Sequence, residues 1–311
     1  MNGSDLGAAW TACMRAGDFT AAWAISDAVL HQRDGIDCSR WPRHEQFVWR
    51  GQPLERKRVL VRCYHGLGDT IQFIRFLPRL KNVARETIVW AQPELIPLLQ
   101  NAPGVDRWLP LHDGVPEVVF DVDVELVELP HIFRTMFATL PRNVPYLDVH
   151  ASAHARGDEL AVGLVWRSGD WVPARSIPKE VAAALARVPG VAVHVLQHGP
   201  ERREWPRNLG VFAGSTRIEE LAAQMRALDL VISIDSFPAH LAGALGVPTW
   251  TLLHHEPDWR WMTGREDSPW YPTMRLWRQA RPGDWQGVIA EVAAELARLA
   301  AKKMPRTKSA A

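Results

Sequence analysis

The sequence predicts an α/β protein made of two doubly wound domains, in which helices cover both faces of a parallel sheet. Short apolar runs suited to buried parallel strands alternate with helical patterns in two blocks of similar size, one from residue 58 and one from residue 161. Polar or glycine-rich turns follow several of these runs, at residues 65–69, 167–176 and 235–236. Because doubly wound sheets bind ligands at the carboxyl ends of their strands, we expect function at these turns.

The composition is that of an ordinary globular protein. The chain has 311 residues, 47% of them hydrophobic and 23% charged, which is enough for two domains. A formal net charge of +1 gives no electrostatic reason to expect nucleic acid as a partner. The basic segment at residues 302–308 predicts at most peripheral contact with an anionic membrane, and a solvated terminus is the favoured interpretation.

Cysteine usage and hydropathy predict a cytoplasmic protein without a metal site. The three cysteines are odd in number and form no CxxC pair, which favours a reducing compartment and no structural zinc. No apolar run reaches the length of about 18 residues that a spanning helix needs, and the first residues lack a signal-peptide pattern. His254 and His255 are adjacent rather than four residues apart, so they do not match a helical zinc site.

The first 45 residues form a domain of their own in this prediction. Residues 6–31 contain two alanine-rich amphipathic pieces separated by Gly17 and Asp18, a pattern typical of a helical hairpin. The second piece is similar to a tetratricopeptide unit, and a single such unit must pack on a neighbour to bury its apolar face. We therefore predict a hairpin at residues 1–45, a first α/β domain at 46–150 and a second at 151–311.

The pattern of apolar runs assigns the elements of both α/β domains. Expected strands are residues 59–63, 87–91, 107–110, 118–122 and 144–149, then 161–166, 191–197, 211–212, 230–234 and 249–253. Expected helices are residues 70–80, 93–101, 179–187, 216–228, 237–245 and a final one from 284. Thr216 and Glu219 have the spacing of a capping box, and Asp284 is expected to cap the last helix.

Residues 229–262 are the most informative stretch. A buried strand is expected to end in the polar turn Asp235-Ser236 and to open a helix with Pro238 in its first turn. The start of a helix presents backbone N–H groups and the positive end of the helix dipole, which attract phosphate. A phosphate or diphosphate ligand is therefore the first hypothesis, whereas the absence of GxGxxG and Walker A patterns leaves nicotinamide binding with little support.

Several segments together resemble a known family. GLGDTIQFIRFLPRL (residues 66–80) resembles the N-terminal signature of glycosyltransferase family 9, the ADP-heptose:lipopolysaccharide heptosyltransferases. IDSFPAHLAGALGVP (residues 234–248) is similar to the donor motif of that family. VPYL, VGLVWRSG, RSIP and PDWRWMTGREDSPWYPTMRLWRQ resemble a bacterial branch in which the glycosyltransferase domain follows tetratricopeptide repeats. The resemblance covers most of residues 40–300.

This resemblance implies a GT-B fold, with two Rossmann-like domains facing across a cleft. It implies that the first domain binds an acceptor and the second a nucleotide-diphosphate sugar, and that a hexose or heptose is transferred without a metal or other cofactor. TIQ after the glycine-rich loop and the tryptophan-rich block after residue 249 depart from the heptosyltransferase pattern and leave the donor sugar open. The expected acceptor is a glycan, a lipid-linked glycan or a protein.

The resemblance also assigns roles to individual residues. Asp69 takes the role of the base that removes the proton from the acceptor hydroxyl, although an aspartate here could simply cap the following helix. Gly68 permits close approach of the backbone to the donor, and a plain tight turn would use it equally well. Arg175 is expected to neutralise the leaving diphosphate, which makes it the second catalytic residue. The remaining predicted donor-binding residues are Arg167, Ser168, Gly169, Gln197, Asp235, Ser236 and His240.

Other interpretations remain open for several of these residues and for the protein as a whole. His240 could be a core histidine satisfied by a backbone carbonyl, and the two arginines could be solvated loop residues. A non-catalytic scaffold, with the hairpin docking a partner, is one alternative function. A sugar-nucleotide epimerase on the same fold is another.

Overall fold

The computed structural model describes residues 3–152, 157–169 and 171–303. The chain forms two compact units, the first made of Met1–Asp148 and Asp258–Arg265, the second of Val149–Pro257 and Glu266–Ala311. Each unit contains one parallel sheet flanked by helices. The predicted α/β fold class is therefore confirmed.

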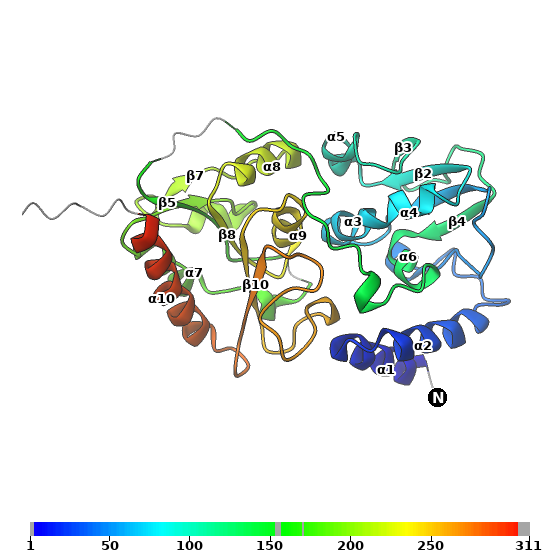
Figure 1. Cartoon of the computed structure of the whole chain (residues 1–311), viewed down its shortest axis with the longest axis horizontal. Coiled ribbons are helices and arrows are strands. Elements are labelled where there is room, and N and C mark those ends of the chain that lie inside the picture. The colour runs from blue at the N-terminus through cyan, green and yellow to red at the C-terminus, as the bar shows by residue number, and fades with distance from the viewer. Residues whose placement is uncertain (1–2, 153–156, 170, 304–311) are drawn as a thin grey trace, which may run out of the picture. The chain divides into compact units, whose positions relative to one another are not determined.

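The sheet of the first unit has four strands. They are β1 (Arg58–Arg62), β2 (Glu86–Ala91), β3 (Arg107–Pro110) and β4 (Val122–Glu125), arranged in the order β3-β2-β1-β4 with every pair parallel (Figure 1). The strand expected at residues 118–122 begins only at Val122, because Val118 and Phe120 pack beside Trp90 instead of joining the ladder. The strand expected at residues 144–149 is absent, and Pro145 within it has no N–H to pair.

Short helices follow the strands of the first unit. They are α3 (Leu67–Phe73), α4 (Leu77–Lys81), α5 (Ile96–Leu99) and α6 (Leu129–Ile132). Helix α3 starts three residues before the predicted residue 70, so Gly68 and Asp69 lie in its first turn rather than in a loop. A 3-10 turn at Ile74–Phe76 separates α3 from α4.

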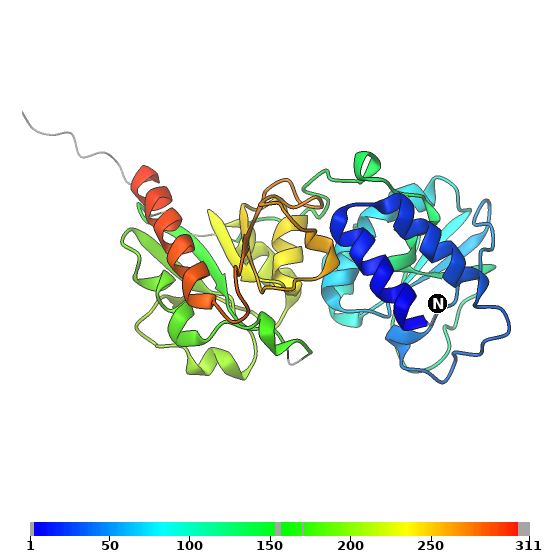
Figure 2. The same ribbon diagram turned by 90° about the horizontal axis from the view of Figure 1, so that it is seen from below.

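The N-terminal hairpin consists of α1 (Gly3–Ala16) and α2 (Phe19–His31), which run antiparallel beside each other (Figure 2). Gly17 allows the turn because its φ is +77°, a value that favours glycine. The Asp18 carboxylate then accepts a hydrogen bond from the Ala21 N–H at 3.0 Å and caps α2.

The hairpin buries its apolar face on residues from the far end of the sequence. Met14, Phe19 and Trp23 form a buried cluster with Met262. The Thr263 N–H donates to the Arg15 carbonyl at 2.9 Å. The segment Asp258–Arg265, which the sequence analysis assigned to the second domain, therefore packs with the first unit.

The second unit has a six-stranded parallel sheet. Its strands are β5 (Leu160–Val165), β6 (Val191–Val195), β7 (Val211–Phe212), β8 (Leu230–Ile234), β9 (Thr249–Leu253) and β10 (Met274–Arg278), in the order β10-β9-β8-β5-β6-β7. This is the strand order of a doubly wound nucleotide-binding sheet, in which the order reverses between β5 and β8. Strand β10 was not predicted from the sequence.

Helices cover both faces of this second sheet. The pair α7 (Lys179–Ala182) and α10 (Trp285–Lys303) lies on one face, and the pair α8 (Ile218–Arg226) and α9 (Phe237–Ala244) lies on the other (Figure 1). The predicted apolar stripe of α10 packs into the core with the strands, through Trp285, Val288, Ile289, Val292 and Leu296. Asp284 caps the start of α10 as expected, because its carboxylate accepts a hydrogen bond from the Gly287 N–H at 2.9 Å.

The start of α8 and the C-terminal basic segment both differ from expectation. The capping box of Thr216 and Glu219 does not form, because Arg217 occupies the cap position and its guanidinium binds the Glu219 carboxylate at 2.8 Å. At the other end, Lys303 of the basic segment pairs with Asp229 at 2.6 Å. Residues 304–308 of that segment lie outside the described residues.

Candidate functional site

The reversal of strand order in the second sheet gathers most of the predicted donor-binding residues at the carboxyl ends of its strands, whereas Gly68 lies in α3 of the first unit. Strands β5 and β8 are neighbours, with Val165 opposite Ser233, so the turns after both strands leave the sheet together. The turn after β5 carries Arg167, Ser168 and Gly169, and the turn after β8 carries Asp235 and Ser236. Such a point is where doubly wound folds bind nucleotides.

An ion pair connects these turns. The Arg175 guanidinium lies 3.6 Å from the Asp235 carboxylate, measured from Nε to Oδ2. The Asp235 side chain is 6% exposed and that of Arg175 is 26% exposed. A basic group held by a buried carboxylate at the ligand edge can bind a phosphate through its remaining N–H groups.

Gln197, predicted to contact the nucleotide, binds protein atoms with both ends of its amide. Its Oε1 accepts from the N–H groups of Trp166 and Arg167 at 3.1 and 3.0 Å. Its Nε2 donates to the carbonyls of Arg167 and His198 at 3.1 and 3.0 Å. In this structure Gln197 therefore fixes the backbone that carries Arg167 and Ser168, and its contact with a nucleotide stays a prediction.

The loop after β5 is held by further contacts. The Arg167 side chain lies 3.4 Å from the Glu201 carboxylate. The Ser168 N–H donates to the Ser176 hydroxyl at 3.3 Å. A Cβ at Gly169 would meet no atom within 4 Å, so the space beside this residue is open.

The helix start after β8 differs in detail from the expected phosphate site. Ser236 occupies the cap position of α9, but its hydroxyl donates to the Ile234 carbonyl at 3.3 Å and makes no capping bond. His240 is buried, and its Nδ1 lies 3.0 Å from the Tyr271 hydroxyl. The partner of this ring nitrogen is thus a tyrosine rather than the backbone carbonyl of the alternative interpretation.

In the first unit, Asp69 lies in the first turn of α3, next to the end of β1. Its Oδ2 accepts the Gly66 N–H at 2.9 Å, so the carboxylate does take part in helix capping. Its Oδ1 contacts the guanidinium of Arg260. Asp69 therefore combines a capping role with a position at the carboxyl end of a central strand.

Arg260 was not among the predicted site residues, because a packed loop was the favoured interpretation of residues 259–261. Its guanidinium bridges Asp69 and Asp258, with 2.8 Å between its Nη1 and the Asp258 carboxylate. It also lies over the rings of Trp259 and Phe73, 4.9 and 5.7 Å from their centroids. Only 14% of this side chain is exposed, and no local pattern indicates a partner 191 residues away.

A second pair missed by the sequence analysis lies where β1 and β4 end together. The His65 ring lies 2.9 Å from the Glu125 carboxylate. Burial disfavours the charged ring, but the hydrogen bond and charge of Glu125, with the charge of Asp69, outweigh it and raise the pKa of His65. This pair sits where the four-stranded sheet reverses its order, which is the signal that could have identified it.

Glu128 completes this group of ionisable side chains. It pairs with Arg33 of the connector after α2, with 2.5 Å between the two charged groups. Burial is the main cause of a raised pKa of about 7 for Glu128, opposed by the charge of Arg33 and reinforced by Glu125. Perturbed acids and histidines at a cavity are typical of functional sites.

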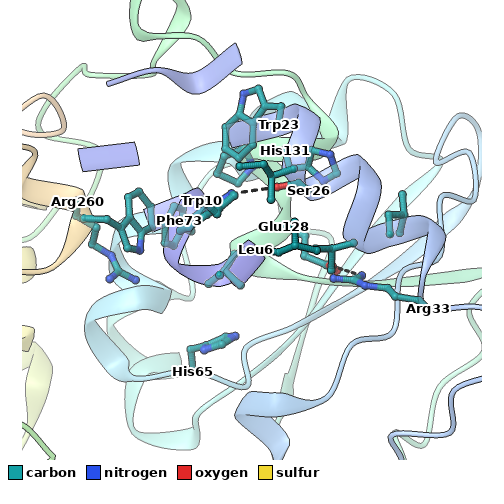
Figure 3. Close-up of a pocket in the computed structure, with 17 residues that line it drawn as sticks. Leu6, Trp10, Trp23, Ser26, Arg33, His65, Phe73, Glu128, His131 and Arg260 are labelled. Carbon is teal, nitrogen blue, oxygen red and sulfur yellow. Dashed lines mark hydrogen bonds and ion pairs between the residues drawn. The ribbon is translucent and has the colours of Figure 1, made fainter. Parts of the chain in front are cut away.

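A pocket of about 430 Å³ within the first unit is bordered by His65, Glu128 and Arg260 (Figure 3). Helices α1 and α2 form one wall, and residues after β1 and β4 form the other. In Figure 3, Arg260 and Phe73 lie on one side of the pocket, and the Arg33–Glu128 pair lies on the opposite side. The hairpin therefore contributes directly to a cavity that reaches His65 and Arg260.

Nowhere in the part of the chain that the structure describes do three or more His, Cys, Asp or Glu side chains gather in a way that could hold a metal ion. No helix within the same residues is long and apolar enough to cross a membrane.

Part of the chain is similar in sequence to known proteins. The pattern of glycosyltransferase family 9 (heptosyltransferase) matches residues 197–271, which include β8, α9 and β9. Protein FlbA of Caulobacter vibrioides is 24% identical over 333 residues, covering 89% of this chain and 51% of FlbA. The chain thus spans about half the length of this curated relative.

Comparison with solved structures confirms the fold. A family 9 glycosyltransferase of Veillonella parvula aligns with a TM-score of 0.57 and 16% identity, covering 81% of this chain and 98% of that one. The ADP-heptose lipopolysaccharide heptosyltransferase II of E. coli aligns with a TM-score of 0.53 and 18% identity, covering 78% and 99%. The chain has the α/β fold of GT-B-like family 9 structures.

Proposed function

We propose that this protein is a glycosyltransferase that moves a hexose or heptose from a nucleoside-diphosphate donor to an acceptor hydroxyl. The observation that carries the proposal is the Arg175–Asp235 pair at the point of strand reversal, in a sheet with the nucleotide-binding strand order. The family 9 match covers the strand–turn–helix that supplies Asp235. An E. coli protein of the same fold is named for ADP-heptose, which supports a nucleoside-diphosphate sugar as donor here.

The donor would bind at the carboxyl edge of the second sheet. Arg175 has guanidinium N–H groups to offer to the diphosphate, and Asp235 fixes the position of that guanidinium. Ser168, Gly169 and the first turn of α9 would add hydroxyl and backbone N–H donors. These groups would neutralise the diphosphate as it leaves, so the proposed reaction uses no metal ion.

The chemical step is a substitution at the anomeric carbon of the donor sugar. The acceptor oxygen forms a bond to that carbon while the bond from the carbon to the diphosphate oxygen breaks, and the diphosphate leaves with the electron pair. The acceptor proton goes to the carboxylate of Asp69, which acts as the general base.

Titration calorimetry with a panel of nucleoside-diphosphate sugars tests the donor half of this proposal. We expect one nucleotide to bind and to bind less well to the Arg175→Ala variant. No heat with any donor would support the scaffold alternative instead. Turnover of the donor to an isomer without an acceptor would support the epimerase alternative.

The catalytic half is tested with Asp69→Asn. A general base typically contributes about 10²–10⁴ to a rate, so we expect a loss of that size in transfer with unchanged donor affinity. Asp113→Asn is the matched control, because Asp113 is a fully exposed aspartate of the same unit. Full activity of Asp69→Asn would exclude the assignment of Asp69 as the base.

A further inference from the structure

The pocket between the helical hairpin and the first sheet has the properties of a ligand site. Its volume of about 430 Å³ lies within the range of about 300–1,000 Å³ that small-molecule pockets occupy. Its apolar walls come largely from the hairpin, through Leu6, Ile25, Val29 and Leu30. Its polar end comes from His65 and Arg260, the second of which contacts Asp69.

Most polar groups of the wall are already satisfied by other protein groups. The Trp10 indole N–H donates to the Ser26 hydroxyl at 3.0 Å, and that hydroxyl donates to the Ala22 carbonyl at 3.1 Å. The Trp23 indole N–H donates to the Thr135 carbonyl at 2.7 Å. A sugar ring buried here would bring many hydroxyls to a wall that offers them few partners, and each unpaired hydroxyl would weaken binding.

Aromatic rings form a continuous part of the same wall. The rings of Phe73 and Trp259 stack with centroids 6.5 Å apart, and the Trp10 ring meets Trp259 edge-on at 5.2 Å. Such a wall favours a flat aromatic ring, which gains from both apolar burial and ring–ring contact. The ligand that fits is therefore apolar and aromatic over most of its surface.

The polar end of the pocket determines where a hydroxyl of the bound ligand can lie. The His65 ring, held by Glu125, and the Arg260 guanidinium are the charged or hydrogen-bonding groups on the side of the pocket that adjoins Asp69. A hydroxyl directed there would lie beside Arg260, whose guanidinium contacts the carboxylate assigned as the base. On the opposite side, Glu128 pairs with Arg33, whose guanidinium also donates to the Trp49 carbonyl at 2.8 Å.

We propose that this pocket binds the acceptor, and that the acceptor is a small molecule with a hydroxylated aromatic ring. The ring packs against the hairpin and the wall of Trp10, Phe73 and Trp259, and its hydroxyl is directed toward His65 and Asp69. The assignment of the ligand as acceptor rests on the proposed function, whereas the binding of such a ring does not. The hairpin is thus a part of the acceptor site.

Gly7 provides a direct test. It lies on α1, is exposed, borders the pocket, and an added Cβ there would meet no atom within 4 Å. We therefore expect Gly7→Phe to place a ring at the rim of the pocket, and a helix interior tolerates phenylalanine better than glycine. Ala8→Phe is the matched control, because Ala8 is exposed on the same helix and does not border the pocket.

The measurement is the dissociation constant of 4-methylphenol, with methyl glucoside as a polyhydroxylated ring of similar size. We expect 4-methylphenol to bind the unmodified protein, Gly7→Phe to weaken that binding by about tenfold or more, and Ala8→Phe to leave it unchanged. Circular dichroism checks that both variants keep their helices. Val29→Phe fills the pocket from α2 and repeats the test if Gly7→Phe does not fold.

Three outcomes would overturn the proposal. One is tighter binding of methyl glucoside than of 4-methylphenol, and another is unchanged phenol binding in both pocket-filling variants. The third is binding of a tyrosine-containing peptide about tenfold or more tighter than 4-methylphenol, which would assign the ring to a polypeptide. Phenol binding without any sugar transfer would contradict the proposed function alone.

Discussion

The guanidinium of Arg260 contacts the carboxylate of Asp69, although 191 residues separate the two in the sequence. Arg260 belongs to the segment Asp258–Arg265, which leaves the second unit after β9 and packs with the first. The same segment buries Met262 against the hairpin. The predicted base is therefore held by a residue of the chain segment that joins β9 to β10.

We expect this pair to be energetically coupled. Replacing Arg260 with Met removes the charge and keeps most of the side-chain length, so it leaves Asp69 and Asp258 without their shared cation. Because the arginine is only 14% exposed, breaking the network should lower the free energy of unfolding by about 1–3 kcal/mol. A double-mutant cycle with Asp69→Asn, measured by urea unfolding, should give a coupling energy above about 0.5 kcal/mol. Additive effects of the two substitutions would show that the contact is not stabilising.

The pH dependence of stability should report the His65–Glu125 pair. Since the folded pKa of His65 is raised above its usual value of 6.5, the pair stabilises the protein below that pH and loses this contribution as pH rises through the folded pKa. Glu125→Gln should reduce this loss of stability above pH 6.5, because neutral glutamine cannot pair with the imidazolium.

Proton NMR titration of the His65 ring and urea unfolding below and above pH 6.5 are the measurements. Glu125→Gln should lower the pKa of His65, because the hydrogen bond and charge of Glu125 no longer oppose the effect of burial and only the charge of Asp69 does so. Glu117→Gln, at an exposed glutamate of the same unit, is the control and should change neither quantity. A His65 pKa that is identical in both variants and the unmodified protein would contradict the assignment.

Much of the fold could be predicted from local pattern. Buried parallel strands such as β1, β8 and β9 are short apolar runs that stand out from their polar turns, and Asp284 and Pro238 occupy the positions that their chemistry favours. Helices and strands that depend on contacts with residues far away in the sequence were given wrong bounds or were not predicted. Strand β10 is one of these, because it joins the sheet only through its ladder with β9.

Some residues of the candidate sites could likewise be predicted from local sequence, and others could not. Asp235 follows β8 directly and Asp69 lies in the first turn of the helix after β1, so the rule that ligands bind at strand ends identifies both from sequence. The partners of Arg260 and Glu128 could not be predicted in this way, because Asp69 and Arg33 lie far from them in the sequence. Gln197 also lies at the end of a strand, where ligand binding is expected, but both the oxygen and the nitrogen of its amide bind the neighbouring loop.

The three cysteines should differ in reactivity. Cys63 is buried, and burial raises the pKa of its thiol to about 12, so only about 10⁻⁴ of it is thiolate at pH 8. Cys38 is also buried, whereas Cys13 is partly accessible. Iodoacetamide at pH 8 should therefore label Cys13 in the folded protein and Cys38 and Cys63 only after denaturation, as read by peptide mass spectrometry. Early labelling of Cys63 would show that β1 opens locally.

Gly243 should be needed for the position of His240. An added Cβ at this residue would lie 2.5 Å from the Tyr271 ring, which is fully buried and has little room to move. Gly243→Ala should displace the tyrosine hydroxyl from His240 and destabilise the second unit by about 1–3 kcal/mol through overpacking. Unfolding by urea measures the loss.

The control for this prediction is Gly169→Ala, since a Cβ there meets no atom within 4 Å and the residue lies in the same unit. Gly169→Ala should leave stability nearly unchanged. If His240 binds the donor, Gly243→Ala should also weaken donor binding by about tenfold. Tyr271→Phe removes only the hydroxyl, so it should weaken donor binding to a similar extent with a smaller loss of stability. Normal donor affinity in both Gly243→Ala and Tyr271→Phe would assign His240 to the core instead.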